Sequence, residues 1–396
     1  MYSEEMYGYG AQSSAIREIF AYGLKRKAQI GDENVYDFSL GNPSVEPPAK
    51  VTESFIKLLK EKAPLELHGY TPAQGDAGVR KAIADDLNER FGTSYTPDNF
   101  YMTCGAAAAL KISLAALFEE GDEALTLMPF FPEYTVFSES TGYKFKPVAT
   151  DPDTFQPDID KLSAAINEKT KLIIINSPNN PSGVVYTEEN ICAVAKLLED
   201  KEKQYGHPIF LIADEPYREL VYGKTVPHLP KYYKNTILCY SYSKSLSLPG
   251  DRIGYICISD DVCESKKLYA AVCGAGRSLG YVCAPTILQK VVGECTSCRP
   301  SLEEYEYNRE LLYNTLTEYG YKCIYPDGAF YLCVKALEDD ATAFAEKAKK
   351  YELLLVPGDS FCAPGYVRIS YCVSADMIKR SLPAFKKLIE DYKENK

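Results

Sequence analysis

The chain has 396 residues, of which 46% are hydrophobic and 25% charged, a composition that excludes a disordered or collagen-like protein. It carries 44 basic and 55 acidic residues, a net charge of −11, and the basic residues are scattered along the chain. Nucleic acid and anionic membrane surfaces both require concentrated lysine and arginine, so we expect neither as a partner.

The chain start and the cysteines favour a cytoplasmic protein. No uninterrupted apolar run approaches the ~20 residues that a membrane span needs. Residues 1–5 include two glutamates where a secretory signal would carry basic residues. The 13 cysteines are spread without the spacing of a disulfide framework, which favours reduced thiols.

Metal sites are not expected. Cys295 and Cys298 form one Cys-x-x-Cys without a second pair or a nearby histidine, so we expect two partly buried thiols in a helix. The chain has only three histidines, which lie far apart in the sequence at His68, His207 and His228. This spacing offers no metal-binding pair and disfavours a Ser-His-Asp triad.

The predicted elements begin with a helix over residues 14–27, where apolar side chains recur at helical spacing behind a pair of serines. Short apolar runs then alternate with helices between residues 99 and 259. The predicted strands are 100–103, 123–128, 172–176, 209–213, 236–240 and 253–258, and the helices include 106–118 and 188–205. This alternation indicates an α/β fold with a mostly parallel sheet covered by helices on both faces. Such sheets bind ligands at the carboxyl ends of their strands.

The last hundred residues show an α+β pattern. The predicted elements are a helix at 301–319, strands at 321–324 and 329–334, a helix at 342–350, a strand pair at 353–356 and 366–370, and a final amphipathic helix. A chain of this length exceeds the size of one hydrophobic core. We predict a large domain over residues 49–286 and a smaller α+β domain built from residues 1–48 together with 287–396.

A lysine follows one of the buried strands. Lys244 comes directly after the strand at 236–240, where burial and a cationic neighbour can lower the pKa of an amine. Arg252, a little further on, is a fixed cation suited to a phosphate. Taken alone, a solvated lysine in a Ser-rich loop explains this segment equally well.

Three more polar clusters follow strands. Asp214 and Tyr217 lie at the end of the strand at 209–213, where an aspartate is ordinarily a helix cap. Asn180 lies in an Asn/Pro/Gly turn over residues 176–183. Residues 103–110 join a strand to a helix through Gly105 and alanines, a turn whose amides can reach an anion. Each pattern alone is also typical of an ordinary turn.

Together and in this order the clusters resemble the fold type I enzymes that use pyridoxal 5′-phosphate (PLP), specifically the class I/II aminotransferases of the aspartate aminotransferase superfamily. The Ser-x-Ser-Lys…Arg, Asn-Pro-x-Gly and Asp-x-x-Tyr motifs carry the resemblance, which extends from about Ile16 to the last helix. It implies the PLP transferase fold, with PLP as cofactor.

The resemblance also implies roles for residues around the cofactor. Lys244 would be the Schiff-base lysine and Asp214 the partner of the pyridinium nitrogen, while Asn180 and Tyr217 would bond the ring hydroxyl. The phosphate would be held by Gly105, Ala106, Ser241 and Arg252, with Ala107 in the same turn. Phe131 matches the family's ring-stacking aromatic residue.

Further residues match positions for the substrate and for a second subunit. Arg368 matches the arginine that binds the substrate carboxylate, and Gly41 and Asn180 match contacts to the same region. Tyr70 resembles the tyrosine that reaches the phosphate of the neighbouring subunit, which implies a homodimer with shared active sites.

The sequence departs from the family at the positions that read the substrate side chain. Ala107 stands where some bacterial relatives carry a lysine that binds the distal carboxylate. Our hypothesis is that Arg277 from the partner subunit contributes to side-chain recognition. The apolar Ala106 and Ala107 shift phosphate binding onto backbone amides, Ser241 and Arg252.

The leading function is therefore an aminotransferase that acts on an amino acid and a 2-oxo acid. The alternative is a PLP-dependent C–S β-lyase that acts on sulfur amino acids, since the same residues serve β-elimination. A third interpretation is the PLP-sensing module of a transcription regulator. Such a protein would need a DNA-binding domain ahead of this one, and only a short helix precedes Gly41, so this interpretation ranks far behind. The amino donor is not determined by these motifs.

Overall fold

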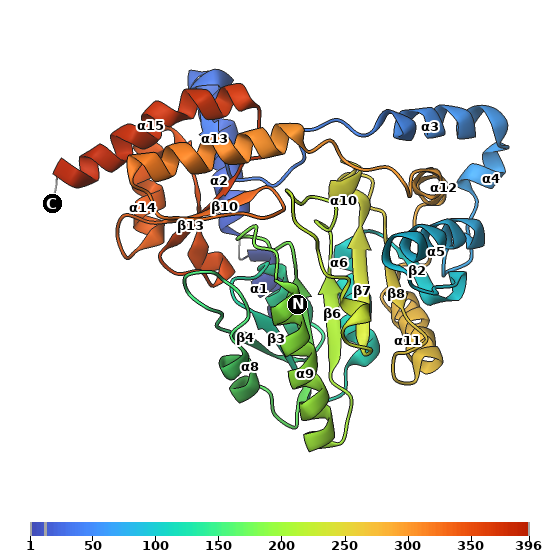
Figure 1. Ribbon diagram of the computed structural model, residues 1–396. Coiled ribbons are helices and arrows are strands. Elements are labelled where there is room, and N and C mark those ends of the chain that lie inside the picture. Colours follow the sequence, from blue (N-terminus) through green and yellow to red (C-terminus); the bar gives the residue numbers. More distant parts are fainter. Residues whose placement is uncertain (1, 12–13, 395–396) are drawn as a thin grey trace.

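A seven-stranded sheet lies at the centre of the computed structural model, which describes residues 2–11 and 14–394 (Figure 1). The strand order is β2-β8-β7-β6-β5-β3-β4, and every neighbouring pair is parallel except those made by β8, which runs antiparallel to β2 and β7. The prediction of a mostly parallel sheet is confirmed. The strands are β2 (Phe100–Thr103), β3 (Glu123–Leu127), β4 (Lys144–Val148), β5 (Thr170–Asn176), β6 (Phe210–Asp214), β7 (Thr236–Ser241) and β8 (Gly254–Ile258).

Helices cover both faces of this sheet because successive strand side chains point to opposite sides. In β5, Leu172 and Ile174 pack in the hydrophobic cluster that contains α6 and α11, whereas Ile173 and Ile175 pack in the cluster that contains α5 and α9. The predicted two-sided cover is thus confirmed (Figure 1). The helices of this region are α3 (Ala49–Glu61), α4 (Pro64–His68), α5 (Ala77–Phe91), α6 (Ala106–Leu117), α7 (Glu133–Glu139), α8 (Ile159–Ala165), α9 (Glu188–Tyr205), α10 (Tyr242–Ser245), α11 (Ser265–Ser278) and α12 (Thr286–Glu294).

A four-stranded antiparallel sheet and three helices form the C-terminal part. The sheet order is β12-β13-β10-β9, and its hydrophobic cluster is separate from those of the large sheet. The elements are β9 (Cys323–Ile324), β10 (Tyr331–Lys335), β12 (Val356–Pro357), β13 (Tyr366–Ser370), α13 (Glu303–Tyr319), α14 (Ala341–Ala348) and α15 (Ala375–Glu394). The boundaries of the two predicted domains stay a prediction.

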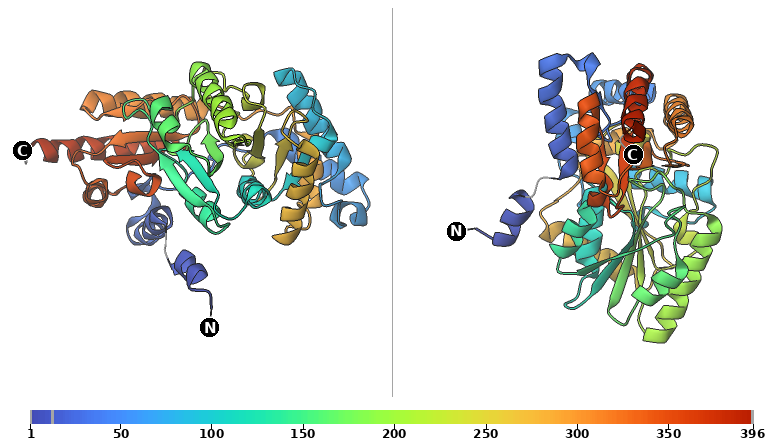
Figure 2. Two further views of the ribbon diagram at one scale, coloured as in Figure 1. Left: turned by 90° about the horizontal axis from the view of Figure 1, so that it is seen from below. Right: turned by 90° about the vertical axis from the view of Figure 1, so that its left-hand side faces the viewer.

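The N-terminal elements pack on this C-terminal part. The side chain of Ser14 caps α2 (Ala15–Ile30) by accepting a hydrogen bond from the amide of Arg17, and Ile19 packs with Leu354, Val356 and Phe361. β1 (Tyr36–Asp37) pairs in parallel with β11 (Leu353–Leu354). α1 (Glu4–Ala11) has no buried residue and projects from the rest of the chain (Figure 2). No helix in the described part of the chain is long and apolar enough to cross a membrane.

Several local predictions were wrong. The edge strand β4 was not predicted. The single strand at 353–356 is two strands, since β11 pairs with β1 and β12 pairs with β13. The Cys-x-x-Cys does not lie in a helix: α12 ends at Glu294, so Cys295 follows it as the C-cap and Cys298 lies beyond. All 13 cysteines are free thiols.

Candidate active site

A cavity of about 360 Å³ opens where the strand ends of the large sheet meet the N-terminal and C-terminal segments. The carboxyl ends of β2, β5, β6 and β7 lie on this edge because those strands point the same way. In the register of β5 and β6, Asn176 lies opposite Asp214. Most of the predicted site residues line the cavity: Gly41, Ala106, Ala107, Phe131, Asn180, Asp214, Tyr217, Ser241, Lys244, Arg252 and Arg368.

One end of the cavity is built to hold an anion. Gly105 precedes α6 with φ of 85°, and a Cβ at this position would lie 2.5 Å from Nη2 of Arg252. The missing side chain lets the guanidinium come close to the helix N-terminus, where the free amides carry partial positive charge. Arg252 also donates to Oγ of Ser243 at 3.2 Å, and that oxygen lies 2.7 Å from Oγ of Ser241.

Asp214 forms the floor of the cavity as a buried carboxylate. Its Oδ2 accepts a hydrogen bond of 2.5 Å from the hydroxyl of Tyr134, whereas its buried Oδ1 has no hydrogen-bond partner among the described residues. Burial raises the pKa of Asp214 to about 7, against the lowering effect of the Tyr134 hydrogen bond and with a contribution from Glu215. An unsatisfied buried acceptor of this kind can receive a proton donor from a ligand.

Lys244 projects into the cavity from the short helix α10. Its Nζ donates a hydrogen bond of 2.7 Å to the carbonyl of Gly41 and lies 5.5 Å from the ring centroid of Phe330. Burial, together with the positive charges of Arg252 and Arg368, lowers the pKa of Lys244 to about 8, although Cys372 has the opposite effect. The amine therefore loses its proton more readily than an ordinary lysine.

Arg368 lines the same cavity with a buried guanidinium. It donates to Oδ1 of Asn180 at 3.2 Å and to the carbonyl of Ser39 at 2.5 Å, and its buried Nε has no hydrogen-bond partner in the part of the chain that the structure describes. The guanidinium lies 4.7 Å from the ring centroid of Tyr331, whose hydroxyl is 2.9 Å from that of Tyr217. No carboxylate of the described residues forms an ion pair with Arg368, and burial lowers the pKa of its guanidinium.

The structure places two predicted residues away from the cavity. Tyr70 is 89% exposed beyond α4, and Arg277 is exposed on α11. Both were assigned to the site of a neighbouring subunit, so their predicted roles stay predictions. Gly105 does not itself line the cavity but supports Arg252 beside it.

Several residues that line the cavity were not predicted from the sequence. Arg17 comes from the first turn of α2 and Glu133 from the start of α7, while Tyr331 comes from β10. The helix over 14–27 was predicted, but its position over the sheet edge depends on contacts with residues more than three hundred positions away. No local pattern could have assigned Arg17 to the site.

These residues fit a phosphorylated pyridine ring such as PLP. The Oδ1 atom of Asp214 can accept from a ring nitrogen, and the anion-binding end can hold a phosphate. Lys244 lies among the same lining residues and can reach an aldehyde carbon of that ring.

Comparisons with known proteins agree with this geometry. Residues 33–385 match the family model "Aminotransferase class I and II". A probable aspartate aminotransferase of Methanocaldococcus jannaschii is 31% identical over 95% of this chain and 97% of its own length. An amino transferase structure from Eubacterium rectale is 54% identical with a TM-score of 0.97, covering 99% of both chains. The aspartate aminotransferase of Thermus thermophilus with maleate is 27% identical with a TM-score of 0.87, covering 98% of this chain and 99% of its own.

Proposed function

The chain belongs to the class I and II aminotransferases and is a PLP-dependent aminotransferase, and from that premise we propose that it moves an amino group between an L-amino acid and a 2-oxo acid at Lys244. Relatives named aspartate aminotransferases make a dicarboxylic amino acid the first donor to test. When bound, PLP withdraws the electron pair that loss of the Cα proton leaves on the substrate.

We assign the cofactor site to residues at or just beyond the ends of β2, β3, β5, β6 and β7. Oδ1 of Asp214 would accept a hydrogen bond from the protonated ring nitrogen, and the negative charge of the carboxylate would keep that nitrogen protonated. Tyr217 and Asn180 would bond the ring hydroxyl, and Phe131 would stack on the ring. Arg252 and the N-terminus of α6 would offset the negative charge of the phosphate and Ser241 would donate a hydrogen bond to it, with Ala106 and Ala107 contributing only backbone.

Lys244 moves the proton in this proposal. When Nζ is not bonded to the cofactor, it would take the proton from Cα of the substrate and pass a proton to the cofactor carbon. A pKa of about 8 supports this role because the amine can exist in both protonation states near neutral pH. The hydrogen bond to the Gly41 carbonyl keeps the amine at the cavity wall.

Arg368 orients the substrate. A guanidinium binds a carboxylate through two parallel hydrogen bonds, which fixes the direction of the neighbouring Cα–H bond. The buried Nε of Arg368 lacks a partner, so the donor is available. Gly41 must stay a glycine in this arrangement, since a Cβ there would lie 2.1 Å from the Tyr331 hydroxyl.

The observation that carries the proposal is the juxtaposition of Lys244 with the unpartnered Oδ1 of Asp214 in one cavity. The test is reduction of the PLP-reconstituted protein with borohydride, followed by peptide mass analysis. We expect the cofactor ring to be fixed covalently on Lys244. Protein that stays colourless after reconstitution, or a ring fixed on another lysine, would contradict the proposal.

A half-reaction separates transamination from β-elimination. Purified holoenzyme given aspartate, or a sulfur amino acid, but no oxo acid should convert at most one equivalent of donor per site and then stop. Ammonia and oxo acid that continue to accumulate would instead identify a lyase. A panel of amino acids in the same assay gives the donor.

We further propose a cytoplasmic homodimer with shared active sites. Tyr70 is 89% exposed and lies outside its own chain's cavity, which supports a role in the neighbouring site. Arg277 is proposed to read the substrate side chain from the partner subunit. If Arg277→Ala leaves the ratio of aspartate to alanine turnover unchanged, while Arg17→Ala lowers it, side-chain recognition belongs to α2 instead.

A further inference from the structure

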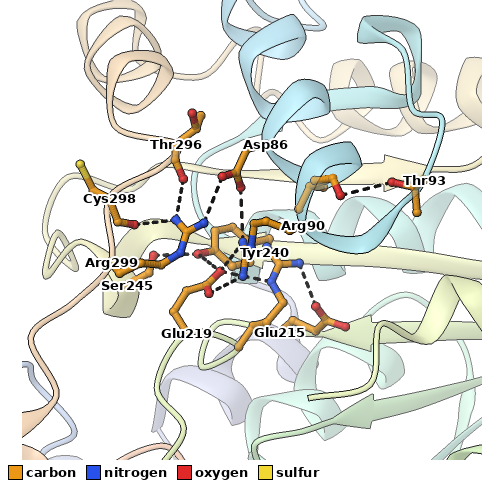
Figure 3. Close-up of polar contacts among 12 residues, drawn as sticks. Asp86, Arg90, Thr93, Glu215, Glu219, Tyr240, Ser245, Thr296, Cys298 and Arg299 are labelled. Carbon is orange, nitrogen blue, oxygen red and sulfur yellow. Dashed lines mark hydrogen bonds and ion pairs between the residues drawn. The ribbon is translucent and has the colours of Figure 1, made fainter. Parts of the chain in front are cut away.

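A chain of alternating charges leads from the exposed Arg299 to the buried Arg218 and Glu215 behind the active site. Three arginines and three carboxylates follow one another in the order Arg299, Asp86, Arg90, Glu219, Arg218 and Glu215, with each neighbouring pair joined by an ion pair (Figure 3). The chain starts in the connection between α12 and α13, crosses α5, and ends in the turn after β6. With all six groups ionised it carries no net charge.

Arg218 is the innermost arginine of this chain, and its side chain is 3% exposed. Its guanidinium donates to Oε2 of Glu215 at 3.0 Å, to Oε1 of Glu219 at 3.3 Å and to the hydroxyl of Tyr255 at 3.0 Å. The group also lies 4.3 Å from the ring centroid of Tyr240. Arg218 therefore has a fixed orientation, determined by four neighbours.

Two of these neighbours lead to the site. Glu215 directly follows Asp214 in the sequence, and the hydroxyl of Tyr240 donates to Oγ of Ser245 at 2.8 Å. Ser245 directly follows Lys244 in the sequence. Arg218 thus contacts the turn that carries Asp214. Through Tyr240 it is also linked to the helix that carries Lys244.

Electrostatics link the same groups. Burial raises the pKa of Glu215 to about 7 even though Arg218 lowers it. Within residues 2–11 and 14–394, Oε1 of Glu215 has no hydrogen-bond partner. The negative charge of Glu215 in turn contributes to the raised pKa of Asp214. The charged groups around Glu215 are Arg218, Glu219 and Arg90, with Asp214 next to it in the sequence.

Stability alone does not account for this arrangement. Replacing a buried ion pair by apolar residues of similar volume is often neutral or stabilising, so burying Arg218 with Glu215 and Glu219 is an inefficient way to hold a core together. A network can instead fix one orientation of the groups that it contacts. The inner end of this network contacts the neighbours of Asp214 and Lys244.

Building on the proposed function, we infer that Arg218 and Glu215 are positioning residues: they hold Asp214 and Lys244 in the geometry and electrostatic field that the cofactor requires. They touch neither the cofactor nor the substrate. Their effect is expected in the cofactor's titration and in kcat, with little change in KM for the donor.

The test compares two variants with a matched control, all as PLP-reconstituted protein. Glu215→Gln removes one charge and keeps the shape. Arg218→Met combined with Glu215→Gln removes the inner pair, and Glu219 keeps its bidentate contact with Arg90 at 2.6 and 3.0 Å, so no carboxylate is left unpaired. The control is Arg309→Met, which removes another buried arginine, 4.3 Å from the Tyr222 ring centroid and outside the cavity.

The readouts are the pH midpoint of the bound cofactor's visible absorbance change, kcat, and the melting temperature. We expect Glu215→Gln to lower the midpoint by about half a pH unit or more, because a negative charge that favours protonated forms in the site is lost. We expect kcat to fall at least fivefold and KM to change less than twofold. Arg309→Met should leave the midpoint and kcat unchanged while lowering the melting temperature.

A midpoint and kcat that match the wild type in folded Glu215→Gln protein would overturn the inference, whatever the melting temperature. Effects of equal size in Arg309→Met would also overturn it, since a general loss of rigidity would then be the cause. Failure of the proposed function would show differently: the wild-type protein itself would bind no PLP.

Discussion

Arg368 is the single side chain on which substrate orientation depends in the proposed reaction. Its buried guanidinium holds Asn180 and the Ser39 carbonyl and leaves Nε for the substrate. Lysine offers one point charge in place of a planar fork, so we expect Arg368→Lys to raise KM for the amino donor at least tenfold, about 1.4 kcal/mol. Steady-state kinetics over a range of donor concentrations measure this.

Arg309→Lys is the matched control for that substitution, because Arg309 is also buried against a tyrosine ring but lies outside the cavity. Its KM should equal that of the wild type. If both lysine variants shift KM alike, the effect of Arg368 comes from packing rather than from binding a carboxylate.

At the scale of elements, the turn from β2 into α6 is the proposed phosphate-binding segment. Gly105 combines φ of 85° with ψ of 178°, a region that other residues rarely adopt, and Arg252 occupies the space of a Cβ. We expect Gly105→Ala to weaken PLP binding at least tenfold, as measured by equilibrium dialysis, because the guanidinium must move away from the helix N-terminus.

Gly121→Ala separates backbone strain from this local clash. Gly121 also has a positive φ of 96°, but no atom lies within 4 Å of the Cβ that alanine would add. Both variants should lose about 1–3 kcal/mol of stability from strain. Only Gly105→Ala should lose cofactor affinity, and equal affinities in the two would contradict the role of the turn.

The elements also show which features local sequence determines. Near-continuous apolar runs predicted six of the seven strands of the large sheet, because those strands are buried on both faces. β4 was missed because it is an edge strand whose lysines and proline face solvent. The antiparallel direction of β8 leaves no trace in its composition.

The residues of the candidate site also differ in how far local sequence predicts them. Asp214 is the last residue of β6, and Lys244 and Asn180 lie three and four residues beyond the ends of β7 and β5, so a motif and a strand end suffice to predict them. Arg17 and Tyr331 reach the cavity only through packing between distant segments. The charge chain behind the site joins α5, the turn after β6 and the α12–α13 connection, and no single stretch of sequence contains its pattern.

At the scale of the whole molecule, His228 is expected to make stability depend on pH. The ring is buried, stacks on Phe91 at 4.2 Å and bonds the Tyr95 hydroxyl at 2.9 Å. Burial lowers its pKa to about 3, helped by the charges of Arg218 and Arg90. The folded chain thus keeps this ring neutral where the unfolded chain takes up a proton.

Stability from His228 is therefore complete above pH ~6.5 and is lost as the pH falls toward 3, at up to ~1.4 kcal/mol per pH unit. Between pH 7 and pH 5, we expect the free energy of unfolding of His228→Gln to fall by about 2 kcal/mol less than that of the wild type, measured by urea unfolding at both pH values. Equal losses in the two proteins would show that His228 is protonated without unfolding.

The proposed homodimer makes a prediction for the surface around α3 and α4. Leu65 is 87% exposed, and Leu59 and Ile56 nearby are 59% and 48% exposed, an unusual density of bare apolar side chains. We expect the wild type at twice 44.2 kDa in light scattering, and Leu65→Glu at the single-chain mass with weaker PLP binding. Leu24→Glu, on the exposed side of α2, should stay dimeric.

The opposed directions of β7 and β8 have one more consequence. The chain leaves β7 at Ser241 and enters the neighbouring strand β8 at Gly254, without crossing the sheet. One connection between adjacent strands therefore carries both the amine of Lys244 and the guanidinium of Arg252. The two residues are eight positions apart, so both belong to one connection rather than to segments that are distant in the sequence. This segment could be transplanted between related scaffolds as a unit. Lengthening it by one residue would change the position of Lys244 relative to Arg252.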